Sequence, residues 1–261
     1  MRTTDMADEL FCGPETELPA GVRLATAKRG GVTVTRVEIA REGLARPRGR
    51  YVTLEMPSVS VLDERDTDVI ETGAAELRVL LPPEGPVLVL GIGNRRVTAD
   101  ALGPRTAQKI LVTMGPQHTL PVRGIRPVAA LAPGVSGDTG LTLRQLAAAM
   151  VDAVRPAALI CVDSLCSAEA ARLGRTIQFS DTGLHPADAR HARHLDAAAL
   201  GVPVIAAGIP TLMDADEGAD LVLTPRALDS VIAHGSALLA GILNRALQPR
   251  LSVAQLCWLT G

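Results

Sequence analysis

Aromatic side chains and lysines are scarce in this chain. Its 261 residues include one Trp, one Tyr and two Phe, so stacking platforms for bases or sugars are not expected. Lys28 and Lys109 are the only lysines, and we interpret the dominance of arginine as codon bias. The formal net charge is -2, which gives no electrostatic reason to expect nucleic acid or an anionic membrane as a partner.

Long apolar runs and paired cysteines are missing too. Proline, glycine or aspartate interrupts every apolar run well before the roughly 18 residues of a membrane span. The polar, acidic start Met1–Glu9 does not resemble a signal peptide. Of the four cysteines, Cys161 and Cys166 have neither zinc-binding nor redox spacing, and Cys161 lies in an apolar run as a small core residue would. A reducing cytoplasm is the simplest compartment.

The N-terminal third has the pattern of antiparallel strands. Residues 1–20 are polar, with two prolines, and are interpreted as a tail or a loosely ordered lead. Val22–Thr26 and Val32–Ile39 alternate apolar and polar residues around a Gly-Gly pair, which predicts a β-hairpin. Tyr51–Leu54 is expected to be a short strand, and Asp63–Leu81 has the spacing of a helix that two prolines stop.

From Val87 onward, short apolar runs alternate with segments of helical spacing. The expected strands are Val87–Leu90, Val128–Leu131, Ala157–Val162, Thr176–Phe179 and Val202–Ala207, and the expected helices are Ala101–Met114, Leu141–Val154 and Arg226–Leu247. Continuous apolar strands separated by helices favour a mainly parallel sheet covered on both faces. The predicted fold is therefore α/β, a mainly parallel sheet flanked by helices (phosphorylase/hydrolase-like), with an N-terminal β-hairpin subdomain.

Three regions follow from these patterns. Residues 1–20 form a tail that could be a propeptide, residues 21–83 hold the hairpin and a helix, and residues 84–261 form the α/β catalytic core. A chain of this length can bury a full core.

Two acids are placed where such a sheet would carry chemistry. The stretch Val87–Arg105 runs from a strand through a glycine turn to Asp100, and Asp163 follows the apolar run Ala157–Val162. Open α/β sheets place their ligands at the carboxyl ends of their strands. Taken alone, Asp100 is more simply a helix N-cap, and Asp163 could cap the next segment in the same way. Together they could share one proton, so that one acts as general base on a water while the other donates a proton. That is peptide hydrolysis without a cofactor.

Other motifs leave alternatives open. His185 could join Asp100 and Asp163 as ligands of a divalent metal, although a lone histidine before proline is more often a loop residue. Asp181 is expected to form a turn by bonding its own backbone, and His191 and His194 are expected on a solvated face. The Gly91-x-Gly-Asn94 turn lacks the third glycine and the distant acid of a dinucleotide fingerprint, so nucleotide binding is not expected.

Several strings of residues bear a resemblance to one known family. They are Arg50–Glu55, Gly91–Asn94, Val97–Pro104, Pro133–Gly137, Val162–Leu165, Thr176–Pro186 and Gly201–Thr211. In the same order, these strings resemble those of the spore germination proteases, which cleave small acid-soluble spore proteins when spores germinate. The resemblance covers most of the chain.

The resemblance implies an atypical aspartic endopeptidase. Its catalytic acids would be Asp100 and Asp163, with no cofactor, and Asp181 receives no role although it lies in a shared string. Its substrates would be small acid-soluble spore proteins in the cytoplasm of the spore core, with no direct contact to nucleic acid or membrane. Family members are zymogens that cleave themselves after an Arg-Thr-Asp pattern, so Arg2–Glu9 predicts self-cleavage between Asp5 and Met6.

Departures from the family pattern keep other readings open. The family has a large segment that is nearly deleted between Asp214 and Leu221, so a homo-oligomer is possible but not fixed, and almost no propeptide precedes Asp5. The loop Ala187–Arg193 replaces glycines of the family. One rival is a metal-dependent hydrogenase-maturation-type endopeptidase, in which His185 would matter more. Another is a non-catalytic binding module on the same fold.

Overall fold

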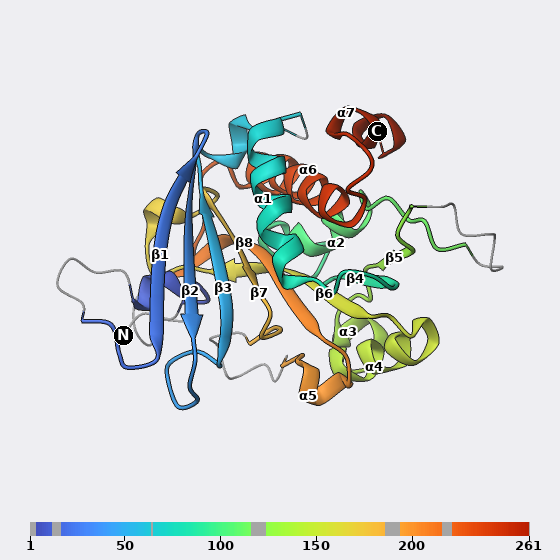
Figure 1. The fold of residues 1–261 in the computed structure, drawn as a ribbon, viewed down its shortest axis with the longest axis horizontal. Helices are drawn as coiled ribbons and strands as arrows, with labels where there is room; N and C mark the ends of the chain where they lie inside the picture. Colours follow the sequence, from blue (N-terminus) through green and yellow to red (C-terminus); the bar gives the residue numbers. More distant parts are fainter. Residues whose placement is uncertain are drawn as a thin grey trace.

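One sheet of nine strands organises the molecule (Figure 1). The computed structural model describes residues 4–11, 17–63, 65–115, 124–185, 194–215 and 221–260. The strands are β1 (Val22–Arg29), β2 (Val32–Ile39), β3 (Gly49–Glu55), β4 (Val87–Gly91), β5 (Val128–Leu131), β6 (Ala158–Cys166), β7 (Thr176–Ser180), β8 (Val204–Asp214) and β9 (Val222–Leu223). They lie in the order β1-β2-β3-β7-β8-β6-β4-β5, with β9 paired to β8.

The sheet has a parallel half and an antiparallel half. β5, β4, β6 and β8 are parallel, as their continuous apolar runs predict. The predicted hairpin of β1 and β2 does form, and β3 joins it to β7, which is antiparallel to β8. The N-terminal strands therefore extend the same sheet. The expected α/β fold is confirmed.

Helices cover both faces of this sheet. The α-helices are α1 (Thr67–Leu80), α2 (Leu102–Ala107), α3 (Ser136–Thr139), α4 (Leu143–Val154), α5 (Ala197–Leu200), α6 (Leu228–Leu247) and α7 (Val253–Thr260). α1, α2 and α6 pack together on one face, over a core that includes Val89, Ile160 and Phe179. α4 and α5 lie on the other face, over a core that includes Leu90 and Cys161 (Figure 1).

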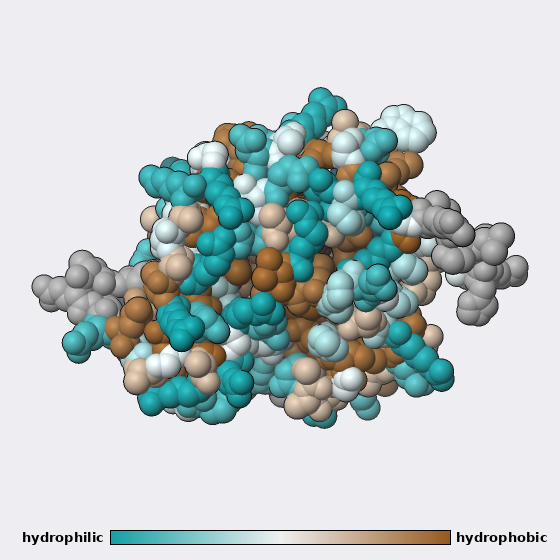
Figure 2. Space-filling model, viewed as in Figure 1, coloured by the Kyte–Doolittle hydropathy of each residue, from teal (hydrophilic) through white to brown (hydrophobic). Residues whose placement is uncertain are grey.

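α6 is the one described helix long and apolar enough to cross a bilayer. Its apolar side chains are mostly buried between α1, α2 and the sheet, since 72% of its most apolar window is inside the protein. A core helix of this kind is apolar for that reason. Apolar surface also gathers in the middle of the face seen in Figure 2, near the C-terminal end of α1, with hydrophilic side chains around it.

Three expectations about local structure were wrong. The helix expected over Ala101–Met114 ends at Ala107 and follows a short 3₁₀ turn, η3 (Thr98–Asp100). The strand expected to end at Val162 continues to Cys166, because its last residues pair with the extended β8. The expected N-terminal tail is packed over residues 4–11, where Met6 and Ala7 are fully buried.

Candidate active site

The turn after β4 folds Asp100 back onto the glycines that precede it. Gly93 has φ +124°, and a Cβ there would lie 2.0 Å from the Asp100 carbonyl oxygen, so only glycine fits this bend. Oδ2 of Asp100 accepts a hydrogen bond of 2.7 Å from the Asn94 backbone N–H. The N-cap of α2 is Ala101, without a side-chain cap bond. Asp100 therefore closes the turn and is not the helix cap that its position alone suggested.

Two glycines bring α2 into backbone contact with the strand ends. A Cβ on Gly91 would lie 2.1 Å from the Gly103 carbonyl oxygen, and a Cβ on Gly103 would lie 2.3 Å from the carbonyl oxygens of Ile92 and Val162. No larger residue fits at either position without a backbone shift. This contact places the start of α2 over the carboxyl end of β4 and the middle of β6, where Gly91 pairs with Val162.

Asp163 lies inside β6, three residues before its end. Its side chain is buried, with 5% of the residue exposed, and Oδ1 accepts a 2.8 Å hydrogen bond from the Ser164 backbone N–H. Burial, and then the nearby charge of Asp163, raise the pKa of the Cys161 thiol, so Cys161 is an unreactive core residue. The Ser164 hydroxyl oxygen is buried, and it has no hydrogen-bond partner among the described residues.

A β-bulge fixes the turn that carries Asp100. The register between β6 and β8 shifts after Leu165, so that Thr211 is the extra residue on β8. Its hydroxyl donates a 3.0 Å hydrogen bond to the Ala99 carbonyl oxygen. η3 also contacts β6 and β8. Bulges of this kind are common beside active sites because they redirect a side chain. The η3 turn that carries Asp100 is thus held against β8 and against β6, the strand that carries Asp163.

The histidine proposed as a third ligand has other partners. Nε2 of His185 lies 2.9 Å from the Thr182 carbonyl oxygen, and Nδ1 lies 3.1 Å from Nδ1 of His194. In the part of the chain that the structure describes, no three His, Cys, Asp or Glu side chains are arranged to hold a metal ion. The set of Asp100, Asp163 and His185 is therefore not brought together. His191 lies outside the described residues.

Asp181 does not form the turn expected of it. Its carboxylate accepts hydrogen bonds of 2.7 Å from both the backbone N–H and Nε of Arg50. These contacts tie the end of β7 to β3. Ser180 is opposite Ala206 on β8, whereas Asp163 is opposite Gly208, so β7 runs away from the edge that holds the two acids. Asp181 is a structural residue in this arrangement.

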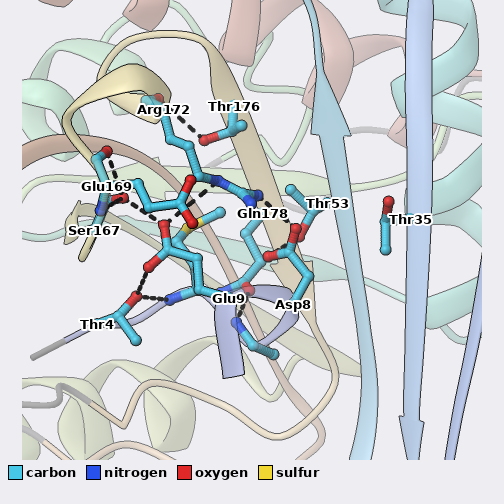
Figure 3. Close-up of polar contacts among 12 residues, drawn as sticks. Thr4, Asp8, Glu9, Thr35, Thr53, Ser167, Glu169, Arg172, Thr176 and Gln178 are labelled. Atoms are coloured by element: carbon cyan, nitrogen blue, oxygen red, sulfur yellow. Dashed lines mark hydrogen bonds and ion pairs between the residues drawn. The ribbon is translucent and has the colours of Figure 1, made fainter. Parts of the chain in front are cut away.

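The N-terminal segment, residues 4–11, lies against the end of β6 and the middle of β7, and Figure 3 shows polar contacts of Thr4, Asp8 and Glu9. The Asp5 N–H donates to the Cys166 carbonyl oxygen, and the Cys166 N–H donates to Oδ2 of Asp5, both at 2.8 Å. Arg46 binds the Thr4 carbonyl oxygen and lies 3.4 Å from the Asp5 carboxylate. Met6 is fully buried. The Asp5–Met6 bond, the predicted cleavage site, is thus held at the carboxyl end of β6.

Comparison with known proteins identifies the family. A profile described as germination protease matches residues 6–217. The chain belongs to the germination protease family. A germination protease of Clostridium perfringens (strain SM101 / Type A) is 32% identical over 278 residues, which cover 84% of this chain and 86% of that protein. That of Caldanaerobacter subterraneus subsp. tengcongensis is 39% identical and covers 80% of this chain and 67% of its own length.

A solved structure also matches. It is a [NiFe] hydrogenase maturation protease HycI from Thermococcus kodakarensis KOD1, with 19% sequence identity and a TM-score of 0.44, covering 66% of this chain and 98% of its own. Membership of the germination protease family makes this chain an endopeptidase. Both Asp100 and Asp163 fall inside the residues that the germination protease profile matches.

Three residues that hold these segments in place escaped the sequence analysis of this germination protease family member. Thr211 bonds the turn that carries Asp100, and Arg172 and Gln178 bond the N-terminal segment, in each case between segments far apart in the chain. Gln178 carried one local signal, because it is a polar residue between Ile177 and Phe179, inside a string that resembles the family. A buried polar residue of that kind needs hydrogen-bond partners.

Proposed function

We propose that this endopeptidase starts the degradation of small acid-soluble spore proteins during germination, in the cytoplasm of the spore core. The observation that supports the proposal is the contact between the η3 turn, which carries Asp100, and β6, which carries Asp163, within the residues that match the germination proteases. The relatives' name supplies spore germination, and the residue strings resembling that family supply the substrate class.

Peptide hydrolysis by two acids needs no further group. One carboxylate takes a proton from a water molecule, whose oxygen attacks the carbonyl carbon of the scissile bond. The other acid, in its protonated form, gives its proton to the amide nitrogen as the C–N bond breaks. Each acid accepts a backbone hydrogen bond, from Asn94 and Ser164 respectively. These bonds fix the carboxylates in place, which supports a role that depends on position.

Substitution of each acid tests this assignment. Asp100→Asn and Asp163→Asn should each lower kcat on a recombinant small acid-soluble spore protein by about 10³-fold, since each removes a proton-transfer group. Asp138→Asn is the matched control, because the side chain of Asp138 is 53% exposed and makes a 3.8 Å ion pair with Arg96. Circular dichroism should show all three variants folded. Full activity of either site variant would exclude the dyad, and an inactive native chain would favour a binding module.

A chelator and a pH–rate profile address the mechanism. Activity that survives chelation and shows two carboxyl-like apparent pKa values would support the dyad. Activity that is lost on chelation and restored by added metal would contradict it and favour the metal-dependent alternative.

We also propose self-cleavage between Asp5 and Met6. The segment is presented at the sheet edge that holds Asp163, and the family match begins at Met6. Mass spectrometry of protein kept at mildly acidic pH should find Met6 as the new N-terminus, and the Asp163→Asn variant should keep Asp5. An intact N-terminus in the native chain would contradict the proposal.

A further inference from the structure

One glutamine side chain holds the main chain on both sides of Met6. Nε2 of Gln178 donates a 2.9 Å hydrogen bond to the Asp5 carbonyl oxygen, and Oε1 accepts a 2.7 Å hydrogen bond from the Ala7 N–H. Gln178 is 7% exposed. Both bonds go to backbone groups, which every peptide has. Gln178 would therefore hold any peptide whose backbone follows the path of residues 5–7, whatever its side chains.

Gln178 lies in the same row of the sheet as Asp163. Asp163 pairs with Gly208 of β8, and Gly208 pairs with Gln178 of β7. Residues opposite each other in a sheet project to the same face, and two strand spacings separate their Cα atoms by about 10 Å. The peptide that Gln178 holds therefore lies on the face of the sheet to which Asp163 projects.

Arg172 supplies a positive charge beside residues 8 and 9. Its guanidinium binds the Asp8 carboxylate and lies 3.4 Å from Oε1 of Glu9, as Figure 3 shows. The Glu9 carboxylate also accepts hydrogen bonds from the Ser167 hydroxyl and the Ala168 N–H. The side chains of Asp8 and Arg172 are almost fully buried, with 5% and 14% exposed. A partly buried arginine without an anion would be costly, so this position selects acidic residues.

We propose that Gln178 and Arg172 bind the substrate, an acidic peptide, and that residues 4–9 occupy the same binding site in the free chain. The inference rests on the proposed function and goes beyond it by naming the residues that bind the substrate. The segment and the substrate then compete for one binding site. A purely structural anchor for the N-terminus would use the same contacts without affecting substrate binding.

If the segment and the substrate compete for one site, substitutions in the segment and in the site should change KM differently. Asp8→Asn weakens only the segment, so KM should fall about tenfold, the value of one charge-assisted hydrogen bond. Arg172→Gln alone weakens segment and substrate alike and should change KM little. Added to Asp8→Asn, Arg172→Gln should raise KM about tenfold again, and so should Gln178→Leu, with kcat nearly constant. If these contacts only anchor the N-terminus, Asp8→Asn and Arg172→Gln should have equivalent effects and neither should change KM.

Two residues elsewhere provide matched controls. Gln248 is 1% exposed and also bonds main-chain groups on both of its amide atoms, through Arg126. Arg245 is 17% exposed and binds Glu71 at 2.7 Å. Gln248→Leu and Arg245→Gln should lower stability without moving KM. A rise in KM in these controls would assign the effect to lost stability.

Cys166 reports binding without any need for catalysis. Burial, then the charges of Asp5 and Asp214, raise the pKa of its thiol to about 12. Alkylation of Cys166 should therefore be slow while residues 4–9 occupy the binding site. In the Asp8→Asn variant with Asp163→Asn to stop turnover, Cys166 should react faster. A synthetic peptide of residues 2–9, or a small acid-soluble spore protein, should protect it again, with Cys257 as internal reference.

The outcomes separate the two proposals. If the peptide protects Cys166 and Gln178→Leu abolishes that protection, the proposed binding site is supported. This holds even if the native chain cleaves no spore protein and the proposed function fails. If neither the peptide nor the spore protein protects Cys166, although the native chain cleaves spore protein, the proposed binding site is contradicted. The proposed function is then unaffected.

Discussion

The parallel and antiparallel halves of the sheet are held together by different means. In the parallel half, Gly91 and Gly103 let backbone atoms of α2 approach the strand ends directly. In the antiparallel half, buried charged side chains add to the apolar contacts between elements, as in the Glu76–Arg36 pair between α1 and β2 and the Arg172 contacts to residues 8 and 9. Backbone contact has little tolerance for change, whereas side-chain pairs can be replaced.

This difference matches the proposed division of labour. Catalytic acids must be held within a fraction of an ångström, and rigid backbone contacts provide that. A binding site that releases one peptide and accepts another is better made from charged and amide side chains, because these can exchange partners while the strands stay in place. The two halves meet at β7 and β8, where Gln178 and Asp163 share one row.

Gly91→Ala should have the largest effect on the fold, because it separates α2 from the parallel half. The new Cβ would lie 2.1 Å from the Gly103 carbonyl oxygen and 2.7 Å from the Ala107 Cβ. Such overpacking should lower the free energy of unfolding by about 3 kcal/mol. It should also reduce activity, since Asp100 moves with the start of α2. Thermal unfolding followed by circular dichroism should show a midpoint lower by about 6 °C or more.

Gly137→Ala is the control for that substitution. Gly137 lies in the short helix α3, and a Cβ there would meet nothing within 4 Å. This substitution should be neutral or stabilise the chain by up to about 1 kcal/mol. Equal unfolding midpoints for Gly91→Ala and the native chain would show that the parallel half does not depend on backbone contact.

Glu76→Gln should have a smaller effect and tests the antiparallel half. The side chain of Glu76 is 6% exposed and accepts hydrogen bonds from both Nε and Nη2 of Arg36, with Arg29 at 3.8 Å. Loss of its charge should lower the free energy of unfolding by about 2 kcal/mol, less than for a fully buried pair because Arg36 reaches solvent. Chemical denaturation measures this difference.

An exposed ion pair on neighbouring strands calibrates that result. Arg23 and Glu38 lie 3.9 Å apart with side chains 86% and 55% exposed, and Arg23→Gln should change stability by less than about 0.5 kcal/mol. A similar change for Arg23→Gln and Glu76→Gln would mean that burial adds nothing to the pair in α1.

The parallel half could be predicted from the sequence because its signals are local. The strand Val128–Leu131 has the bounds expected for it, and the glycine turn after Val87–Leu90 led to Asp100. The lengths of some helices and strands in that half were predicted wrongly. The helix from Leu102 stops at Ala107, and β6 and β8 continue past their apolar runs because they pair with each other. Pairing between distant segments leaves no local pattern.

The N-terminal segment was unpredictable for the same reason. Its acidic, polar composition is typical of a disordered tail, yet Asp8 and Glu9 are buried because Arg172 lies across from them. The partner is more than 160 residues away in the chain. The composition of a segment predicts how that segment behaves in isolation. Here the fold brings the positive charge of Arg172 to the acidic segment.

Tyr51 should show the smallest effect and reports on the junction between the hairpin strands and β7. Burial raises its pKa to about 12, and its hydroxyl donates a 2.8 Å hydrogen bond to the Pro47 carbonyl oxygen. The fold thus favours the neutral phenol, so this contribution to stability is complete below pH of about 10 and is lost as the pH rises toward 12. Because the chain has one tyrosine, tyrosinate absorbance should titrate near pH 12 in the native chain and near 10 after denaturation. The Tyr51→Phe variant should lose less stability over that range. A native midpoint near 10 would mean that solvent reaches the ring and that β3 is not packed against β7 as described.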